Sequence, residues 1–171
     1  MKYKEEQTIY YGQVHTDDWS MYLAATDKGL CFVGSENTGL DEMKEWFGKN
    51  RSKAKLVEDW NNVAKYANQL VEYLHGIRKV FDLPVDLMGT AFQDAVWKEL
   101  KNIPFGETKT YTDIAKNIGK PKSVRSVGTA IGANPILMVV PCHRVISKSG
   151  KMAGYRGGIP MKEKLLELEK R

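Results

Sequence analysis

Apolar residues follow two different repeats along this chain, and the change between them limits the folds that it can adopt. Residues 9–14 and 19–25 alternate or run apolar with aromatic and β-branched side chains, which is typical of strands. A turn at 27–29 predicts that 30–33 pairs back as a hairpin. Later apolar residues recur every three or four positions, which is typical of amphipathic helices. The repeats therefore predict an α+β chain with its strands first.

Two helices are predicted before the middle of the chain, at residues 40–47 and 60–75. The second is marked by an apolar stripe and by Gly76, which stands where a helix C-cap would be. Residues 79–87 look extended and are broken by Pro84. We expect a domain boundary at 86–89, where the charge sign changes and a new helix begins.

The second half of the chain predicts a mostly helical domain. Thr90 and Gln93 fit a capping box for its first helix, and Thr110 can cap a short helix at 111–118. A glycine-containing turn joins that helix to another at 123–132, which is a helix-turn-helix pattern. The other elements predicted here are an apolar strand at 136–140 and a final helix at 160–169.

The predicted fold class is therefore α+β. It has a small N-terminal α/β domain with an antiparallel sheet at residues 1–88. A mostly helical, winged-helix-like domain that contains the helix-turn-helix follows at 89–171.

The net charge of +5 is distributed unevenly between these halves. Residues 1–89 hold 11 Lys+Arg against 14 Asp+Glu, a net −3, whereas residues 90–171 hold 15 against 7, a net +8. A basic half can face a polyanion such as nucleic acid, or it can be a solvated basic surface, and charge alone favours neither. Lysines and an arginine on and around the predicted turn favour nucleic acid: Lys116, Lys120, Lys122 and Arg125.

Several classes of protein are disfavoured by what the sequence lacks. No apolar run approaches the roughly 20 residues of a membrane helix, and the N-terminus does not resemble a signal peptide. Two distant cysteines form neither a disulfide framework nor a zinc motif, and no phosphate-binding glycine loop occurs. We therefore expect a cytoplasmic protein with no metal and no cofactor.

Cys142 has a setting that suggests reactivity, whereas Cys31 lies inside a predicted strand and is interpreted as a small buried hydrophobe. Cys142 precedes His143 and Arg144, a candidate base and a candidate cation. A base needs an orienting group, and Glu163 is the nearby carboxylate in sequence. On spacing alone, Glu163 is more readily explained as a solvated charge near a helix N-terminus.

At this point the chain resembles the O6-alkylguanine-DNA alkyltransferase family. The resemblance rests on the active-site signature Pro-Cys-His-Arg-Val at 141–145 and extends over about residues 90–171. Further matching elements occur in the family's order and spacing: Phe105-Gly106-Glu107, Tyr111, Ala115, Gly119, Val124-Arg125-Ser126-Val127-Gly128, Asn134-Pro135, Gly154-Tyr155 and Lys162-Glu163. Over residues 1–89 only size and pattern are similar, which implies a ribonuclease-H-like supporting domain.

The resemblance implies a role for each matching position. Cys142 would accept the alkyl group, His143 would take the thiol proton through a water, and Glu163 would orient that imidazole. Asn134 would be the hinge before the active-site segment, and Tyr111 would hydrogen-bond the guanine ring. The implied base pocket contains Tyr111, Val145, Tyr155, Arg156 and Gly157, and the carbonyls of Cys142 and Val145 would accept from the exocyclic amine.

The resemblance also implies the partner. Duplex DNA that contains O6-alkylguanine would bind through its minor groove to a monomer, and the base would flip out because its oxygen lies inside the stack. Arg125 would fill the gap, and other implied DNA contacts are Thr112, Lys122, Ser123, Ser126, Gly128 and Ala130. Repair would be a single irreversible transfer to Cys142, from O4-alkylthymine as well, and DNA binding would bring the protein to the nucleoid.

Three alternatives remain open on the residues. A non-catalytic alkyltransferase-like lesion-binding protein would replace the cysteine, so Cys142 argues against it. A helix-turn-helix regulator would leave the Cys-His pair unexplained and would need more base-reading side chains. A cysteine hydrolase would need an oxyanion hole and would not explain the basic helix pair.

Overall fold

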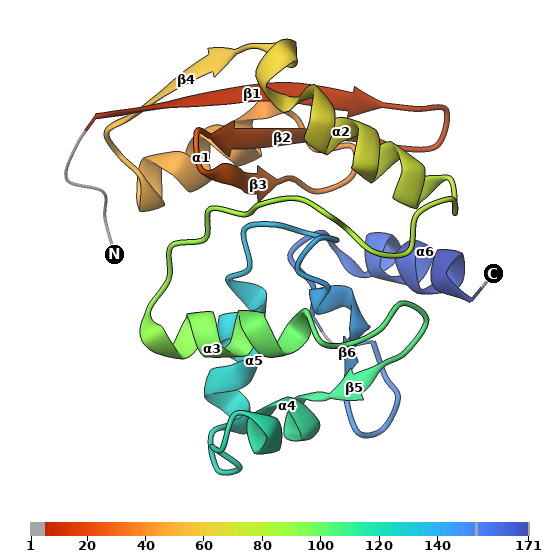
Figure 1. The fold of residues 1–171 in the computed structure, drawn as a ribbon. Coiled ribbons are helices and arrows are strands. Elements are labelled where there is room, and N and C mark those ends of the chain that lie inside the picture. Colours follow the sequence, from red (N-terminus) through yellow and green to blue (C-terminus); the bar gives the residue numbers. More distant parts are fainter. Residues whose placement is uncertain (1–5, 153, 171) are drawn as a thin grey trace. The chain divides into compact units, whose positions relative to one another are not determined.

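The structure is a computed structural model that describes residues 6–152 and 154–170. The chain divides into two units, Met1–Leu87 and Met88–Arg171. The first unit contains four strands and two helices (Figure 1): β1 Gln7–His15, β2 Ser20–Thr26, β3 Gly29–Val33, α1 Leu40–Asn50, β4 Ala54–Glu58 and α2 Trp60–Leu74. The predicted strands and helices of this half are confirmed, apart from β4, which the sequence did not indicate.

The sheet of the first unit is mixed, with the strand order β3-β2-β1-β4. β1, β2 and β3 pair antiparallel as predicted, and β4 adds a parallel partner to β1 that the prediction did not include. A parallel partner needs a crossover, and the segment that contains α1 supplies it. β4 went unnoticed because its residues alternate charged with only half-buried side chains.

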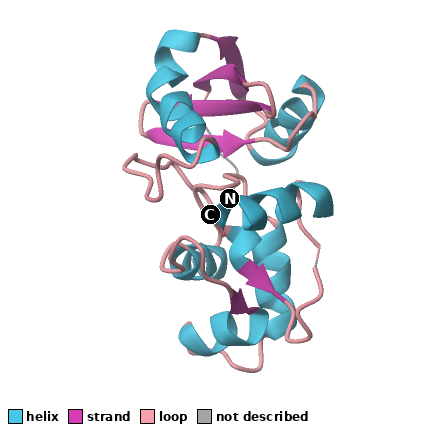
Figure 2. Ribbon diagram, turned by 90° about the vertical axis from the view of Figure 1, so that its right-hand side faces the viewer, coloured by secondary structure: helices cyan, strands magenta, loops and turns pink. Residues whose placement is uncertain are grey.

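Helices cover both faces of this sheet (Figure 2). Met43 and Phe47 of α1 pack with Ile9 in one apolar cluster. Gly12 faces α2, where an added Cβ would lie 2.9 Å from Val63 Cγ2. Ile9 and Gly12 are three residues apart on β1, and successive side chains alternate between the faces, so the two helices lie on opposite sides.

The second unit is built from helices and one short strand pair. Its elements are α3 Ala91–Leu100, β5 Lys109–Thr110, α4 Tyr111–Asn117, α5 Val124–Gly132, a 3-10 helix Cys142–Arg144, β6 Val145–Ile146 and α6 Ile159–Glu169. The capping boxes at Thr90 and Thr110 satisfy the first amides of α3 and α4. The predicted helices of this half are therefore confirmed.

α3, α4 and α5 pack against one another. The indole of Trp97 in α3 donates to the carbonyl of Ala130 in α5 at 2.9 Å, so the contact between these helices includes a buried hydrogen bond. β5 and β6 pair parallel and bring the start of α4 beside the segment that follows Cys142. This pair therefore places Tyr111 and Cys142 in one region of the unit.

The predicted strand at 136–140 is wrong. These residues are buried, but they form turns in which the amide of Val140 donates to the carbonyl of Ile136 and Met138 has a φ of 71°. The Asn134 side chain bonds both ends of the segment and closes it. A short apolar run predicts burial better than it predicts a strand, because buried loops and strands share that composition.

Candidate active site

Cys142 begins the 3-10 helix and is 3% exposed. Its amide donates to the carbonyl of Val140 at 2.8 Å, which ties it to the preceding turn. Its Sγ accepts a hydrogen bond from Asn134 Nδ2 at 3.2 Å. The sulfur is therefore held by a side chain that lies eight positions earlier in the sequence.

Asn134 connects the end of α5 to this cysteine, and its side chain is fully buried. Its Oδ1 accepts from the amide of Ile136 at 2.9 Å, and its Nδ2 donates to the carbonyl of Val140 at 2.8 Å and to Cys142 Sγ. One amide thus closes the turn and points an N–H at the nucleophile. Asp in this place would lack that donor.

Burial raises the pKa of the Cys142 thiol, and the hydrogen bond from Asn134 and the positive charges of Arg156 and Lys162 oppose that rise. The protonated thiol therefore dominates at neutral pH. Because a thiol reacts as its thiolate, the site needs a base that removes the proton as the sulfur attacks.

His143 supplies an imidazole whose orientation is fixed. Its Nε2 lies 2.5 Å from Glu169 Oε2, and both side chains are buried. A carboxylate can only accept, so Nε2 carries the proton and Nδ1 is the basic nitrogen of the neutral ring. Burial lowers the pKa of His143, and the hydrogen bond and charge of Glu169 raise it in part.

The carboxylate that hydrogen-bonds the His143 ring belongs to Glu169. The assignment of Glu163 as the orienting group is therefore corrected. Glu163 is exposed on α6, whereas Glu169 is buried at the end of that helix. The two lie six residues apart, which places them on different sides of an α-helix. The sequence did hold the signal, because Glu169 continues at intervals of four the buried stripe of Met161 and Leu165.

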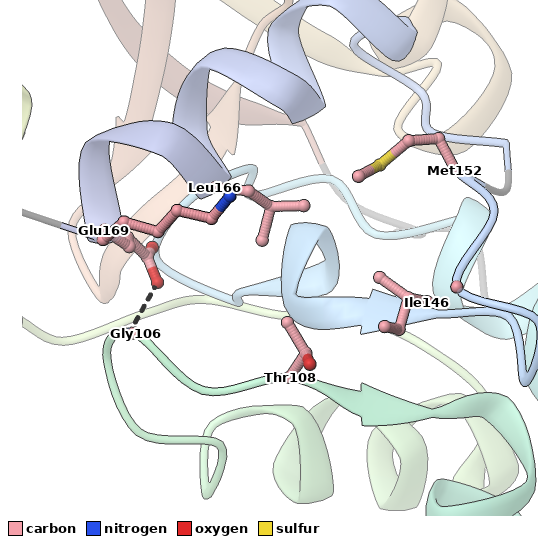
Figure 3. Close-up of a pocket in the computed structure, with 8 residues that line it drawn as sticks. Gly106, Thr108, Ile146, Met152, Leu166 and Glu169 are labelled. Carbon is pink, nitrogen blue, oxygen red and sulfur yellow. Dashed lines mark hydrogen bonds between the residues drawn. The ribbon is translucent and has the colours of Figure 1, made fainter.

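Glu169 is also bound by Arg144, which the sequence predicted as a cation for the cysteine and not as a partner of a carboxylate. Arg144 Nε donates to its Oε1 at 2.8 Å and Arg144 Nη2 to its Oε2 at 3.2 Å. The amide of Gly106 donates to Oε1 at 3.1 Å (Figure 3). Each carboxylate oxygen therefore accepts from two donors, and the buried charge of Glu169 is compensated.

A cavity of about 200 Å³ borders Glu169 (Figure 3). Apolar side chains of three segments line it, namely Ile146, Met152 and Leu166. Cys142 does not line this cavity. The cavity is therefore not a pocket in which a nucleobase could reach the sulfur of Cys142.

Lys162 is a second buried cation beside the cysteine segment, one turn into α6. Its Nζ donates at 2.7 Å to the carbonyl of Val145, which the resemblance assigns to the exocyclic amine of a base. A carbonyl oxygen has two lone pairs, so this contact leaves one for a ligand. Burial lowers the pKa of Lys162, and negative charge on Cys142 raises it.

Tyr111 is half-buried at the first position of α4. Burial raises the pKa of its hydroxyl, and charge on Cys142 raises it further, so the phenol stays protonated as a donor near the sulfur. A Cβ on Gly128 of α5 would lie 3.8 Å from the Tyr111 ring. α5, the second helix of the helix-turn-helix, and Tyr111 are therefore neighbours.

The candidate DNA-contacting residues are not all at the surface. Exposed or half-buried positions in α4, α5 and the connecting turn include Thr112, Lys122, Ser123, Arg125, Ser126 and Gly128. Ala130 is 3% exposed, and its carbonyl accepts from Trp97. The assignment of Ala130 to a DNA-contacting face is corrected, because this residue faces α3.

The loop that holds three of the candidate base-pocket residues lies directly before α6. Tyr155, Arg156 and Gly157 are half-buried, and the amide of Gly158 donates to the carbonyl of Tyr155 at 2.8 Å. A Cβ on Gly157 would lie 2.5 Å from Met161 Sδ and 2.7 Å from Tyr155 Cε1, so a larger residue here would have to displace these two side chains. Ala153 lies outside the described residues.

Across residues 6–152 and 154–170, no group of three or more His, Cys, Asp or Glu side chains could hold a metal ion. No helix in the described part of the chain combines the length and apolarity needed to cross a bilayer.

Known proteins resemble this chain over nearly its whole length. Residues 9–87 match the 6-O-methylguanine DNA methyltransferase ribonuclease-like domain, and residues 91–171 match the DNA-binding domain of the same proteins. The inducible methylated-DNA–protein-cysteine methyltransferase of Bacillus subtilis is 52% identical over 96% of this chain and 92% of its own length.

Solved structures give the same result. A crystal structure of Mycobacterium tuberculosis O6-methylguanine methyltransferase is 39% identical, with a TM-score of 0.80 over 95% of this chain and 93% of the other. One of Mycobacterium tuberculosis OGT in complex with DNA has a TM-score of 0.77 at 39% identity, over 94% and 92% of the two chains. The chain therefore belongs to the methylated-DNA–protein-cysteine methyltransferase family.

Proposed function

We propose that this protein repairs alkylated DNA by moving the alkyl group from O6 of guanine, or O4 of thymine, onto Cys142. The observation that carries this proposal is the arrangement of one buried thiol, bound by Asn134, in the same segment as an imidazole that Glu169 orients. The family membership and a relative's structure with DNA support the same reaction class.

The transfer follows from the chemistry of these groups. His143 Nδ1 takes the proton of the thiol through a water, and Sγ attacks the alkyl carbon. The S–C bond forms as the C–O6 bond breaks, and the electron pair stays on the guanine oxygen. Tyr111 donates to the guanine ring and disperses that charge, and the base regains a proton. The thioether has no easy hydrolytic exit, so each molecule acts once.

DNA is gripped by α4 and α5 in this proposal. Cations of the α4–α5 turn and of α5 contact phosphates, which positions the duplex without reading its sequence. We propose that α5 enters the minor groove of DNA bound to a monomer, with the small Gly128 facing Tyr111. DNA binding would place the protein on the nucleoid. The unit Met1–Leu87 acts as a support for this unit.

The alternative is lesion binding without transfer. Proteins of that kind lack the acceptor cysteine, whereas here Cys142 is present together with a base and its carboxylate. Alkyl transfer is therefore the function that the site supports best.

The test of the proposed function is stoichiometric. The purified protein is mixed with a duplex that contains one O6-methylguanine, and its intact mass is followed with time. We expect a gain of one methyl group per protein, on the peptide that contains Cys142, and a matching loss of lesion. Turnover beyond one lesion per protein, or duplex binding without any mass gain, would rule out single-use transfer.

Arg125→Ala tests base flipping. Arg125 is exposed on α5, where its side chain can enter the gap left by a rotated base. Unstacking a base costs a few kcal/mol, so losing part of that support is expected to slow repair of the duplex about 10- to 100-fold. Transfer from the free base O6-benzylguanine needs no flipping and is expected to keep its rate.

The matched control is Lys120→Ala, which removes an exposed cation from the α4–α5 turn. It is expected to weaken duplex binding in a salt-dependent way without changing the rate at saturating duplex. Equal losses on duplex and free base for Arg125→Ala would argue against flipping.

A further inference from the structure

Arg156 connects the loop of residues 155–158 to the turn that follows α5. Its Nε donates to the carbonyl of Asn134 at 3.1 Å, and its Nη2 donates to the carbonyl of Pro135 at 3.2 Å. A planar guanidinium can bind two neighbouring acceptors at once, which an ammonium cannot do with the same geometry. One side chain therefore spans two segments that are distant in sequence.

The direction of the Arg156 side chain is fixed by its own loop. It is the second residue of a turn that the bond from Gly158 N to Tyr155 O closes. A Cβ on Gly157 would crowd the side chains of Tyr155 and Met161, and Gly158 has a φ of 90°. The loop is therefore tightly folded at the position from which Arg156 projects.

The Asn134–Pro135 turn, to which Arg156 donates, also contacts the sulfur of Cys142. Asn134 accepts from Arg156 through its backbone carbonyl, and it donates to Cys142 Sγ through its side chain. Asn134 thus contacts both the guanidinium of Arg156 and the sulfur of Cys142. The charge of Arg156 opposes the rise in the pKa of Cys142 that burial causes, which agrees with this proximity.

We propose that Arg156 is a positioning residue, a latch that holds the loop of residues 155–158 on the Asn134–Pro135 turn and so fixes the surroundings of Cys142. It acts through protein carbonyls, not through a DNA phosphate. The role rests on the alkyl-transfer function proposed above. It assigns to this chain's own arginine a task in closing the base pocket and in supporting the thiolate as its proton leaves.

Single-turnover kinetics separate this role from DNA binding. Transfer is measured against the concentration of an O6-methylguanine duplex for wild type, Arg156→Ala, Arg156→Gln and Arg156→Lys. Since a loosened site costs rate, we expect Arg156→Ala and Arg156→Gln to lower the saturated rate about 10-fold, with the half-saturating duplex concentration unchanged. A raised half-saturating concentration with an unchanged saturated rate would overturn the latch, because Arg156 would then be a phosphate contact.

The conservative variant and a control test the charge and the loop. Arg156→Lys keeps the cation, so we expect it to recover part of the rate lost in Arg156→Gln. The exposed Lys148 lies in the turn that follows β6, and Lys148→Ala is expected to keep the saturated rate. An unchanged saturated rate in Arg156→Gln, or a rate in Arg156→Lys no higher than that in Arg156→Gln, would contradict the proposal.

Two readouts do not depend on repair activity. Hydrogen exchange at the Gly158 amide is expected to speed up in Arg156→Ala, because releasing the loop exposes that amide. The thiolate absorbance of Cys142 is expected to appear at higher pH in Arg156→Gln than in wild type, since a charge that lowers the thiol pKa is lost. Cys31 does not interfere, because burial raises its pKa to about 12.

Unchanged exchange and unchanged titration would overturn the latch even if the wild-type protein repairs DNA. If wild type transfers no methyl group, the proposed function fails, while the exchange experiment still decides whether Arg156 holds the loop.

Discussion

Cys142→Ala is expected to abolish methyl transfer and to leave duplex binding intact. The side chain that would form the S–C bond is then absent, and residues 88–171 hold no second cysteine. Asn134 loses one acceptor but keeps the carbonyl of Val140, so the turn is expected to hold. Mass spectrometry after incubation with the damaged duplex measures transfer, and an electrophoretic shift measures binding.

Cys31→Ala is the matched control for this variant. Cys31 is buried in the first unit, where its Sγ lies 3.4 Å from the carbonyl of Ala24 and burial raises its pKa to about 12. It is therefore inert, and its loss is expected to leave transfer unchanged. A methyl group found on Cys142→Ala, or transfer lost only in Cys31→Ala, would reverse the assignment of the acceptor.

Glu169→Gln is expected to slow transfer about 10²- to 10⁴-fold, the range for losing an oriented general base. Glu169 raises the pKa of His143, so removing its charge lowers that pKa further and weakens the base. The amide also leaves Arg144 without a carboxylate in a buried site, which we expect to cost about 3–5 kcal/mol of stability. Rates are therefore compared at a temperature where circular dichroism shows both proteins folded.

Glu163→Gln distinguishes between the two carboxylates. Glu163 is exposed, and its substitution is expected to change the transfer rate by less than about twofold and stability by less than about 0.5 kcal/mol. If Glu163→Gln slowed transfer and Glu169→Gln left the transfer rate unchanged, α6 would have to present its other face to His143.

The comparison of these two residues shows what could be predicted from the sequence. Local rules worked where local contacts decide, as in the capping boxes at Thr90 and Thr110. Glu163 was assigned on its match to a family motif near the start of α6, and the orienting carboxylate instead depends on which side of the helix faces His143. The stripe through Leu165 carried that information, but burial of a glutamate is rare unless it is paired.

Other misses have a similar origin. The segment 136–140 is apolar because it is buried, and its shape depends on Asn134 and not on its own residues. β4 has little apolar pattern because its side chains are only partly covered. Arg144 and Lys162 bond groups far along the chain, so neither role could be predicted from neighbouring residues.

The burial of His143 has a consequence for the balance of protons in repair. After transfer the sulfur is a neutral thioether, so an imidazolium on His143 no longer has a thiolate on Cys142 to balance its charge. Because burial lowers the pKa of His143, the imidazolium gives up its proton readily once the transfer is complete. The departing guanine is the group that needs a proton. The hydrogen that leaves the cysteine therefore ends on the repaired base. We expect repair in a weakly buffered solution to leave the pH of the solvent unchanged.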